Sequence, residues 1–551
     1  MPTSRGLGQS VLRRRGLLAL AGGVTGGVVL GRPAWTRPAV QAAVTNRPVP
    51  QSTAGLIRTR DAISHVQTGD VTPTGGVLWG RSEGQGQLHL RLTSGGREVR
   101  TQVGPAAVDA TDRTARIDLS GLAPGREYEA QVWFASAEGV AGERRTVTFA
   151  TPALTPAATS FAWSGDTCGQ GYGINPDAGG LVGYAAVADL RPDVFIHCGD
   201  NIYADEPITD TVIEPGGTTW RNLVTDHVAR PAQTLAEYRG RYRYVLLDEN
   251  VRRLHASVPV IAQWDDHETT NNWYPGEVLG DDTTFPYDEE RRVDVLAGFG
   301  RRAWQEYMPI GTRHLLGRGE TGFAAKGIYR KVSRGAHLDV FCLDQRSYRG
   351  GNDEQLADGG ERPAALMGEE QTDWLIREVT ASSATWKVIS ADQPLALAPR
   401  QERDFDGYGN GDDGAPRGRE HEVARVLSAF RAAGVRNVVW ITADVHFTAA
   451  HRFDPGRAAF TDFDPFWEFI AGPLACSSFG TKTPDTTFGA EQVFAKGNPE
   501  PSRRAPRPDQ LFVGYGEITA DGLLTVSLRD ATGAVLHSVD LEPEPVGRRP
   551  G

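Results

Sequence analysis

Four short apolar runs in this chain each end in aspartate together with histidine, cysteine or tyrosine. The stretches are residues 161–168 (FAWSGDTC), 191–205 (RPDVFIHCGDNIYAD), 260–268 (VIAQWDDHE) and 438–446 (VVWITADVH). Runs rich in β-branched and aromatic residues predict buried strands. In open α/β sheets, ligands collect at the carboxyl ends of the strands, so these polar residues can meet at one place. The pattern therefore predicts an α/β fold with a metal site along the edge of its sheet.

Length and composition limit what such a chain can be. A chain of 551 residues exceeds what one ordinary core can hold, so we expect at least two domains. The formal net charge of -11 argues against a nucleic-acid scaffold, because binding to phosphates needs an excess of Lys and Arg. The 4 cysteines are too few for a disulfide framework. Two of them, Cys198 and Cys342, lie within apolar runs and are expected to be buried thiols.

Residues 1–42 are predicted to form a twin-arginine signal peptide. Arg14 and Arg15 precede an apolar stretch that continues to Leu30, and Ala42 ends a small-residue cleavage pattern. The alternative is an apolar N-terminus without a targeting role. No other stretch approaches the roughly 20 apolar residues of a membrane-spanning helix. We therefore expect a secreted, extracellular protein, exported by the twin-arginine route, with no transmembrane anchor after processing.

Residues 46–151 are predicted to form a small all-β domain. Short stretches there alternate apolar and polar side chains, which is typical of strands. Leu122, Pro124 and Tyr128 have the spacing of the tyrosine corner of fibronectin- or immunoglobulin-like sandwiches, with Trp79 as a candidate core aromatic. We expect a structural role for this domain. A wall of the active-site cleft, or a carbohydrate- or surface-binding unit, are the alternatives.

A proline-rich linker at residues 152–159 precedes the predicted catalytic domain, residues 160–543, and residues 544–551 form a flexible tail. Helical patterns alternate with apolar runs in this domain, which predicts an α/β sandwich with mixed sheets. The expected helices are residues 180–190, 234–247, 291–308, 369–381 and 419–433. The expected strands include residues 328–333, 336–343, 386–390, 438–442 and a meander from 511. Residues 276–288 and 404–418 are expected as loops that either shape the site or lie plainly on the surface.

The four motifs hold ligand-type residues at short spacings. Asp166 and Cys168 lie two apart, as do Asp444 and His446, and residues 265–268 (DDHE) are consecutive. Each motif alone is a weak signal, because such pairs occur in many loops. Four in order, each directly after an apolar run, favour a metal centre over turn acids and surface histidines. A thiolate among the ligands would favour a metal such as Fe or Zn.

The order of these motifs, GDTC, GDNIY, WDDHE and ADVH, resembles that of the calcineurin-like metallophosphoesterases. The residues of these motifs, together with LDQRSYRG at residues 343–350, are similar to those of the alkaline phosphatase D family, including its secreted metal-dependent phospholipase D members. The resemblance covers essentially the whole chain after the signal. It implies a four-layer metallophosphoesterase α/β sandwich with mixed sheets, preceded by a small all-β fibronectin/immunoglobulin-like sandwich.

The resemblance also implies roles for individual residues. Asp200 would bridge two metals, and His267 would be the catalytic residue beside the leaving group. Asn201 and Arg346 are candidate substrate contacts, although an internal ion pair suits Arg346 equally well. Residues 390–394 (SADQP) lack the histidine that the superfamily has there, which makes the second site richer in oxygen. The expected cofactors are Fe3+ and Ca2+, with Zn2+ or Mn2+ as alternatives, and the implied metal ligands are Asp166, Cys168, Asp200, Tyr203, Asp266, Asp444 and His446.

These residues predict a phosphoric ester hydrolase, in which a metal-activated hydroxide attacks a phosphate monoester or diester. His267 would stabilise or protonate the leaving oxygen. We expect a monomer whose partner is its phosphate ester substrate. One alternative is a phospholipase D-type phosphodiesterase, which would need an apolar rim for acyl chains. Another is a non-enzymatic metal- or surface-binding protein. The candidate rim residues are Trp273, Tyr274, Phe285, Tyr287, Phe463, Phe466, Trp467 and Phe469.

Overall fold

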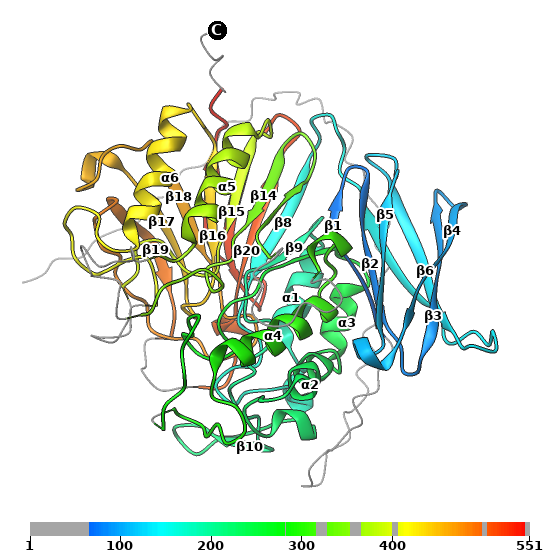
Figure 1. Ribbon diagram of the computed structural model, residues 1–551. Coiled ribbons are helices and arrows are strands. Elements are labelled where there is room, and N and C mark those ends of the chain that lie inside the picture. Colours follow the sequence, from blue (N-terminus) through cyan, green and yellow to red (C-terminus); the bar gives the residue numbers. More distant parts are fainter. Residues whose placement is uncertain are drawn as a thin grey trace, which may run out of the picture. The chain divides into compact units, whose positions relative to one another are not determined.

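Two mixed β-sheets form the centre of the structure (Figure 1). The computed structural model describes residues 65–281, 283–315, 328–352, 365–398, 406–498 and 504–545. The predicted signal peptide, residues 1–42, lies outside the described residues, as do residues 546–551 of the predicted tail. Within the described ranges, no helix is both long enough and apolar enough to cross a membrane.

The larger sheet has nine strands in the order β22(Val535–Leu541), β21(Leu524–Asp530), β20(Phe512–Ile518), β8(Thr159–Ser164), β9(Phe195–His197), β12(Val260–Ala262), β1(His65–Thr72), β2(Gly75–Arg81) and β5(Thr114–Ser120). The smaller sheet has seven, in the order β13(Arg330–Ser333), β14(Leu338–Cys342), β15(Trp386–Ser390), β16(Val438–Thr442), β18(Phe466–Ile470), β17(Thr448–Phe453) and β19(Ala490–Lys496). Strands β8, β9 and β12 are parallel neighbours, and so are β15 and β16. The carboxyl ends of parallel neighbours lie at the same edge of a sheet, which brings successive motifs together.

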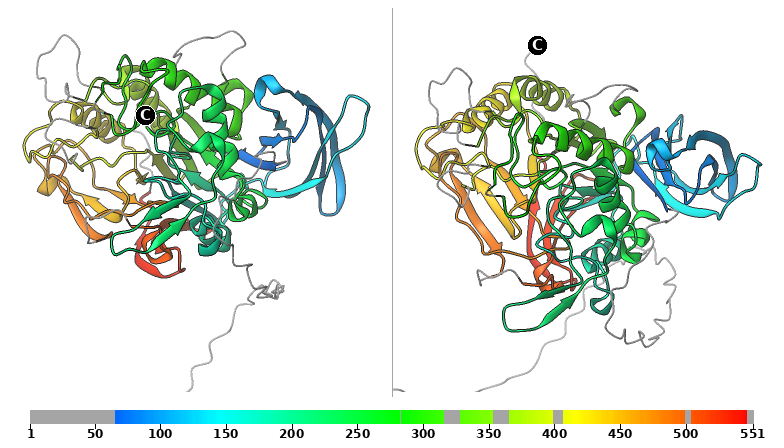
Figure 2. Two further views of the ribbon diagram at one scale, coloured as in Figure 1. Left: turned by 90° about the horizontal axis from the view of Figure 1, so that it is seen from below. Right: turned by 60° about the horizontal axis from the view of Figure 1, so that its bottom comes forward.

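Helices cover the outer face of each sheet, so the fold has four layers (Figures 1 and 2). Helices α1(Val182–Leu190), α2(Leu235–Val245), α3(Glu249–His255) and α4(Val293–Tyr307) share a buried cluster with β8, β9 and β12. Helices α5(Gly368–Ala381) and α6(Glu420–Ala432) pack in the same way on β14, β15 and β16. A third cluster joins the facing sides of the two sheets, with Ile196 and Ile261 from one and Val388 and Val439 from the other. The predicted four-layer α/β sandwich with mixed sheets is confirmed.

The N-terminal β region shares a sheet with the larger part of the molecule. A four-stranded sheet, β4(Arg97–Ala107), β3(Gly86–Ser94), β6(Glu127–Ala135) and β7(Arg145–Ala150), packs against β1, β2 and β5 through a common apolar cluster. β1 also pairs in parallel with β12, where Gly69 lies opposite Val260. A Cβ on Gly69 would lie 2.5 Å from the Val260 carbonyl oxygen, so this close strand contact requires glycine. The backbone N–H of Ala123 donates to the Tyr128 hydroxyl at 2.8 Å, as in a tyrosine corner.

Trp79 does not belong to the core of this sandwich, which corrects its predicted role. Successive side chains of a strand point to opposite faces, so Leu78 enters the sandwich core while Trp79 faces the helices. Its indole N–H donates to the carbonyl of Glu306 in α4 at 2.6 Å, and its ring lies 5.9 Å from that of Tyr307. Trp79 therefore fixes the N-terminal strands to α4.

The predicted helices coincide with α1, α2, α4, α5 and α6 to within a few residues. Thr234 and Glu237 form a capping box at the start of α2, which explains why the helix begins there. The pattern did not separate α3, which has only seven residues, or the strand hairpins β17 to β19. A two-stranded hairpin, β10(Thr211–Ile213) and β11(Thr219–Arg221), extends from the loop after β9.

Candidate metal centre

Four strand ends bring their polar residues to one place. Asp166 follows β8, Asp200 follows β9, Asp266 follows β12 and Asp444 follows β16. Three groups of side chains have ligand atoms that lie within 4.8 Å of one another. Each neighbouring pair of groups has one aspartate in common, so the three form a continuous row. The groups are Asp166 with Asp200 and His446, then Asp200 with Asp266 and His267, then Asp265 with Asp266 and Asp444.

The backbone at three of these four strand ends is left-handed. The φ angles of Asp166, Asp200, Asp444 and His446 are 68°, 51°, 62° and 58°. Residues other than glycine rarely adopt this conformation, and Asp, Asn and His tolerate it best. Residues held in such conformations cluster at functional sites, because the turn directs a side chain where an ordinary strand end would not. The strained turns therefore mark Asp166, Asp200, Asp444 and His446, which are part of the set that the motifs predict.

Tyr203 and His446 meet at the first group. The Nδ1 atom of His446 lies 2.7 Å from the Ser477 carbonyl oxygen, which can only accept, so Nδ1 carries the hydrogen. The Nε2 atom of the neutral ring is therefore an acceptor, and it lies 2.7 Å from the Tyr203 hydroxyl and 3.9 Å from Asp166. This arrangement aims an imidazole lone pair, a phenol oxygen and carboxylates at a common point.

His267 has a different second partner. Its Nδ1 atom donates to Asp205 at 2.7 Å, and its ring stacks on that of Tyr203 with 3.8 Å between the ring centroids. Burial disfavours a charged ring, but Asp205 and Asp266 outweigh it and hold the pKa of His267 well above its usual range. His267 is thus placed as a proton donor or cationic group beside the row of carboxylates.

Arg346 is the cation at the other end of the row. Its guanidinium is completely buried and pairs with Asp265 and Asp406. It also lies 3.6 Å from each of Asp266, Asp392 and Asp444. Of the two predicted roles for Arg346, the internal ion pair is the one with direct contacts. Asp406 comes from the predicted loop at residues 404–418, so this part of the loop shapes the site.

The surroundings of two carboxyl groups in the row disfavour their charged form. Burial above all, and then Asp265, raises the pKa of Asp166 well above its usual range. Burial, followed by Asp266, has the same effect on the pKa of Asp200. One oxygen of Asp166 and both oxygens of Asp392 are buried and have no hydrogen-bond partner among the residues that the structure describes. Buried carboxylates of this kind are normally paired or bound to metal, so the donors fit hard or borderline metal ions.

Cys168 and Asn201 do not have the contacts expected of a metal ligand and of a substrate contact. Cys168 joins an apolar cluster with residues of the helices and is in none of the three groups. Another thiol, that of Cys476, lies 3.5 Å from Nδ1 of His446, 3.9 Å from Nε2 and 4.0 Å from the Tyr203 hydroxyl. It too is in none of the three groups. The side-chain amide of Asn201 donates to Gln263 and Glu268, so it holds the loop together.

Sequence reasoning did not single out three further residues of the site. Asp265 lies beside Asp266, and Asp205 ends the second motif, but nothing in their spacing distinguishes them from loop acids. Asp406 comes from a segment without a ligand motif, and only the tertiary structure brings it to Arg346. Asp392 belongs to the segment that is predicted to make the second site richer in oxygen, and it lies 3.6 Å from Arg346. Most of the candidate aromatic rim is core, since the side chains of Trp273, Tyr287, Phe463, Phe466 and Phe469 are buried.

Comparisons with known proteins identify a family and a fold. Residues 161–525 match the family described as PhoD-like phosphatase. Alkaline phosphatase D of Bacillus subtilis (strain 168) is 26% identical over 352 residues, which are 60% of this chain and 53% of that protein. The match thus spans about half the length of the Bacillus protein.

Two solved structures share the fold. A structure of PhoD is 18% identical with a TM-score of 0.62, covering 86% of this chain and 92% of that one. The purple acid phosphatase PPD1 from yellow lupin (Lupinus luteus) is 12% identical with a TM-score of 0.50, covering 87% of this chain and 73% of that one. At these identities the structures support the fold alone. The family match and the fold together establish that this chain belongs to the PhoD-like phosphatase family.

Proposed function

We propose that this protein is a metal-dependent phosphoric ester hydrolase that cleaves phosphate monoesters, diesters or both. One observation carries the proposal: three ligand groups form a continuous row through the shared Asp200 and Asp266. The residues of such a row would hold adjacent metal ions, which would supply the charge stabilisation for an in-line displacement at phosphorus. The family match and the resemblance to alkaline phosphatase D support the same reaction class.

The donor atoms differ along the row, and this supports two kinds of metal. The first group combines carboxylates, an imidazole and the adjacent Tyr203 phenol, which suits Fe3+, with Zn2+ or Mn2+ as alternatives. The third group consists of carboxylates alone, which suits a hard cation such as Ca2+. When bound, such ions supply Lewis-acid activation of water and neutralise the charge of the phosphate.

His267 and Arg346 have separate tasks in this proposal. His267, held by Asp205 through Nδ1, presents Nε2 towards the row and can give its proton to the leaving oxygen. Arg346 balances part of the carboxylate charge and keeps Asp265 in position. These two roles match the positions of the residues, because Arg346 lies at one end of the row and His267 lies near its centre.

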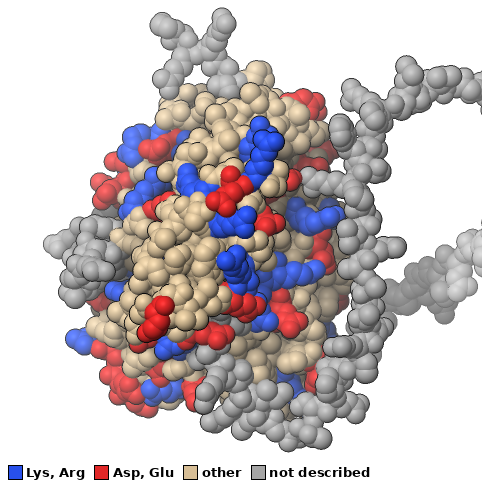
Figure 3. Space-filling model, turned by 90° about the vertical axis from the view of Figure 1, so that its right-hand side faces the viewer, with Lys and Arg blue, Asp and Glu red and all other residues tan. Residues whose placement is uncertain are grey.

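We also propose export by the twin-arginine route, followed by action as a monomer outside the cell. The support for export is the Arg14–Arg15 pair with the apolar stretch behind it. Cleavage of phospholipids is an outcome to be tested and not a second proposal, because most of the aromatic residues that could form an acyl rim are buried. The face in Figure 3 carries acidic and basic side chains interspersed, and this gives no argument for docking on an anionic bilayer.

The test is hydrolysis by the purified chain after incubation with Fe3+, Ca2+, both ions or neither. The substrates are p-nitrophenyl phosphate, bis(p-nitrophenyl) phosphate and phosphatidylcholine, and a visible absorption spectrum is recorded beside each assay. We expect release of nitrophenol that needs metal, and a visible band from an iron–phenolate bond that disappears in Tyr203→Phe. Release of choline would select the phospholipase alternative. A folded protein that binds no metal and cleaves none of the three esters would overturn the proposal and favour a non-enzymatic binding protein.

A further inference from the structure

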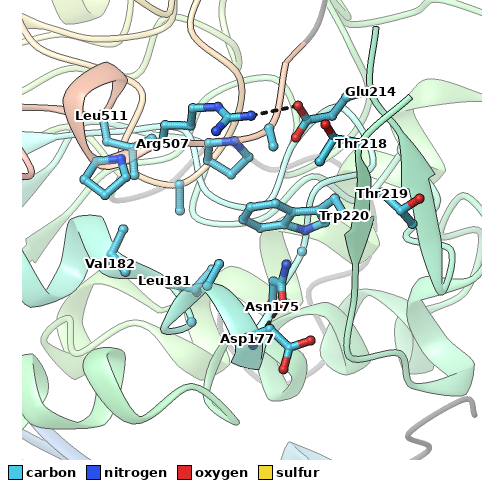
Figure 4. Close-up of a pocket in the computed structure, with 17 residues that line it drawn as sticks. Asn175, Asp177, Leu181, Val182, Glu214, Thr218, Thr219, Trp220, Arg507 and Leu511 are labelled. Carbon is cyan, nitrogen blue, oxygen red and sulfur yellow. Dashed lines mark hydrogen bonds and ion pairs between the residues drawn. The ribbon is translucent and has the colours of Figure 1, made fainter. Parts of the chain in front are cut away.

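A cavity of about 300 Å³ lies beside the metal centre but is not part of it (Figure 4). Its walls come from the segment before α1, from the β10–β11 hairpin and from residues 505–511. None of the residues in the three ligand groups lines it. Ala475 forms the common wall: it lines the cavity, and its backbone N–H donates to the Asp166 carbonyl at 3.0 Å. The cavity is therefore a separate space with its own chemistry.

Trp220 presents a fixed aromatic surface to this cavity. Its indole N–H donates to Asn222 at 2.9 Å, and its ring meets that of Tyr172 edge-on at a centroid distance of 5.7 Å. These contacts hold the ring in one orientation. Leu181, Val182 and Leu511 lie across from it, so the space between them is apolar on both sides (Figure 4). A flat molecule can enter such a space with little loss of freedom for the protein, because the ring is already ordered.

Asn175 supplies a polar group that no described residue uses. Its side-chain oxygen accepts from the backbone N–H of Asp177 at 3.0 Å, and this fixes which end of the amide is the nitrogen. The side chain is 6% exposed, and its nitrogen points towards Trp220 (Figure 4). No described residue accepts a hydrogen bond from that nitrogen. A nearly buried donor without a partner points to an acceptor on a ligand.

Two of the three charged side chains that line the cavity neutralise each other. Glu214, which is nearly buried, accepts from the guanidinium of Arg507 at 2.9 Å, and the pair lies across the cavity from Asn175 (Figure 4). The third, Asp177, is an exposed acid. An anionic ligand would therefore enter without a counter-ion, whereas a neutral hydroxyl or carbonyl group could bond at the edge of the Glu214–Arg507 pair. Thr218 and Thr219, which also line the cavity, are uncharged.

We propose that this cavity binds an uncharged ring with one apolar face and a polar edge, the shared chemistry of pyranose sugars and nucleobases. The apolar face stacks on Trp220, and an oxygen or ring nitrogen of the edge accepts from the Asn175 amide. Because Ala475 separates the cavity from Asp166, this binding is independent of the phosphoesterase proposal. The proposed binding does not depend on the function of the metal centre.

The experiment is fluorine NMR of the full chain labelled with 5-fluorotryptophan, in which Trp220→Phe identifies the signal of Trp220 among the 12 tryptophans. Methyl α-glucoside and adenosine are the two neutral probes, and glucuronate is the charged counterpart of the first. We expect a saturable shift of the Trp220 signal with one of the neutral probes below roughly 10 mM. The glucoside and adenosine arms distinguish a sugar from a nucleobase. Glucuronate should bind more weakly than the glucoside.

Two variants show whether binding occurs in this cavity. Asn175→Ala should weaken the binding about 3- to 10-fold, the effect of one lost hydrogen bond to a neutral group. Asn437→Ala is the matched control, because its amide donates to Glu544 at another part of the surface and its removal should leave binding unchanged. The absence of a saturable shift with both neutral probes would overturn the proposal. So would tighter binding of glucuronate, or equal affinity of the Asn175→Ala and wild-type proteins.

Discussion

His267 and His446 are two buried imidazoles of one site that differ in the partner of Nδ1. In His446 the partner is the Ser477 carbonyl, and Nε2 faces Tyr203 and Asp166. In His267 the partner is the carboxylate of Asp205, and Nε2 lies 4.0 Å from Asp266. A neutral carbonyl favours a neutral ring with a free lone pair, whereas a carboxylate favours the protonated ring.

The different Nδ1 partners of the two rings show that burial alone does not assign a role to a histidine. Both rings are nearly inaccessible, and both belong to groups with ligand spacing. The raised pKa of His267 follows from Asp205 and Asp266, which outweigh its burial. We therefore expect His446 to hold a metal and His267 to hold a proton, and metal content should separate the two roles.

Replacement of Asp200 should have the largest effect, because Asp200 belongs to the group of His446 and to that of His267. We expect Asp200→Asn to lose the metal of the first group and, through the group that it shares with Asp266, to weaken binding of the other ion. The expected loss in kcat/KM is more than about 10⁴-fold, since each ion supplies several kcal/mol of charge stabilisation. Elemental analysis and steady-state kinetics measure both. The control is Asp193→Asn, at the opposite end of β9, which bonds Ser160 and should keep its metal. An inactive Asp200→Asn protein with wild-type metal content would contradict this prediction.

His446→Ala should remove the metal of the first group while the carboxylate group at Asp265 keeps its ion. The expected loss in kcat/KM is about 10³-fold, because one ion and not two is missing. The iron–phenolate band should disappear with the metal, which absorption spectroscopy detects. His451→Gln serves as the comparison, because His451 is a buried imidazole that pairs with Glu468 outside all three groups. Retention of the band in His446→Ala would end the assignment of His446 as a ligand.

His267→Gln should lower kcat by on the order of 10²-fold with no change in metal content, because general acid–base help is worth 10²–10⁴-fold. A substrate whose leaving group needs no proton, such as p-nitrophenyl phosphate, should be affected less than an alkyl phosphate. Loss of metal in this variant would show that His267 is a ligand of the second group and would erase the contrast with His446.

Asp205→Asn should have the smallest effect, about 10- to 100-fold on kcat, because it acts only through His267. The asparagine can still accept from the backbone N–H of Asn271, but it cannot favour a charged imidazole. In the double variant with His267→Gln the two losses should not add, because both changes disable the same proton donor. Additive losses would show that Asp205 acts independently of His267. Asp248→Asn, a helix cap without contact to either histidine, should leave kcat unchanged.

Much of the site could be predicted because its residues follow strands directly. Asp166, Asp200, Asp266 and Asp444 each stand where an apolar run ends, and parallel strands bring such ends to one edge. Cys168 shows the limit of this argument. Its spacing from Asp166 equals that of His446 from Asp444, and all four residues have left-handed φ angles, but the thiol of Cys168 joins an apolar cluster. The packing around each turn decided that outcome, and sequence spacing does not report it.

The layered α/β fold, the order of the motifs and the acidic character of the site can all be predicted from the sequence. These depend on local hydrophobic patterns and on residues that are neighbours along the chain. The tertiary structure alone decided that β1 joins the central sheet, that Trp79 faces α4 and that Asp392 and Asp406 reach Arg346. It also decided the partners of the two histidines and the cavity at Trp220. Each of these contacts joins segments far apart in sequence, and their chemistry depends on burial, which only the packed structure sets.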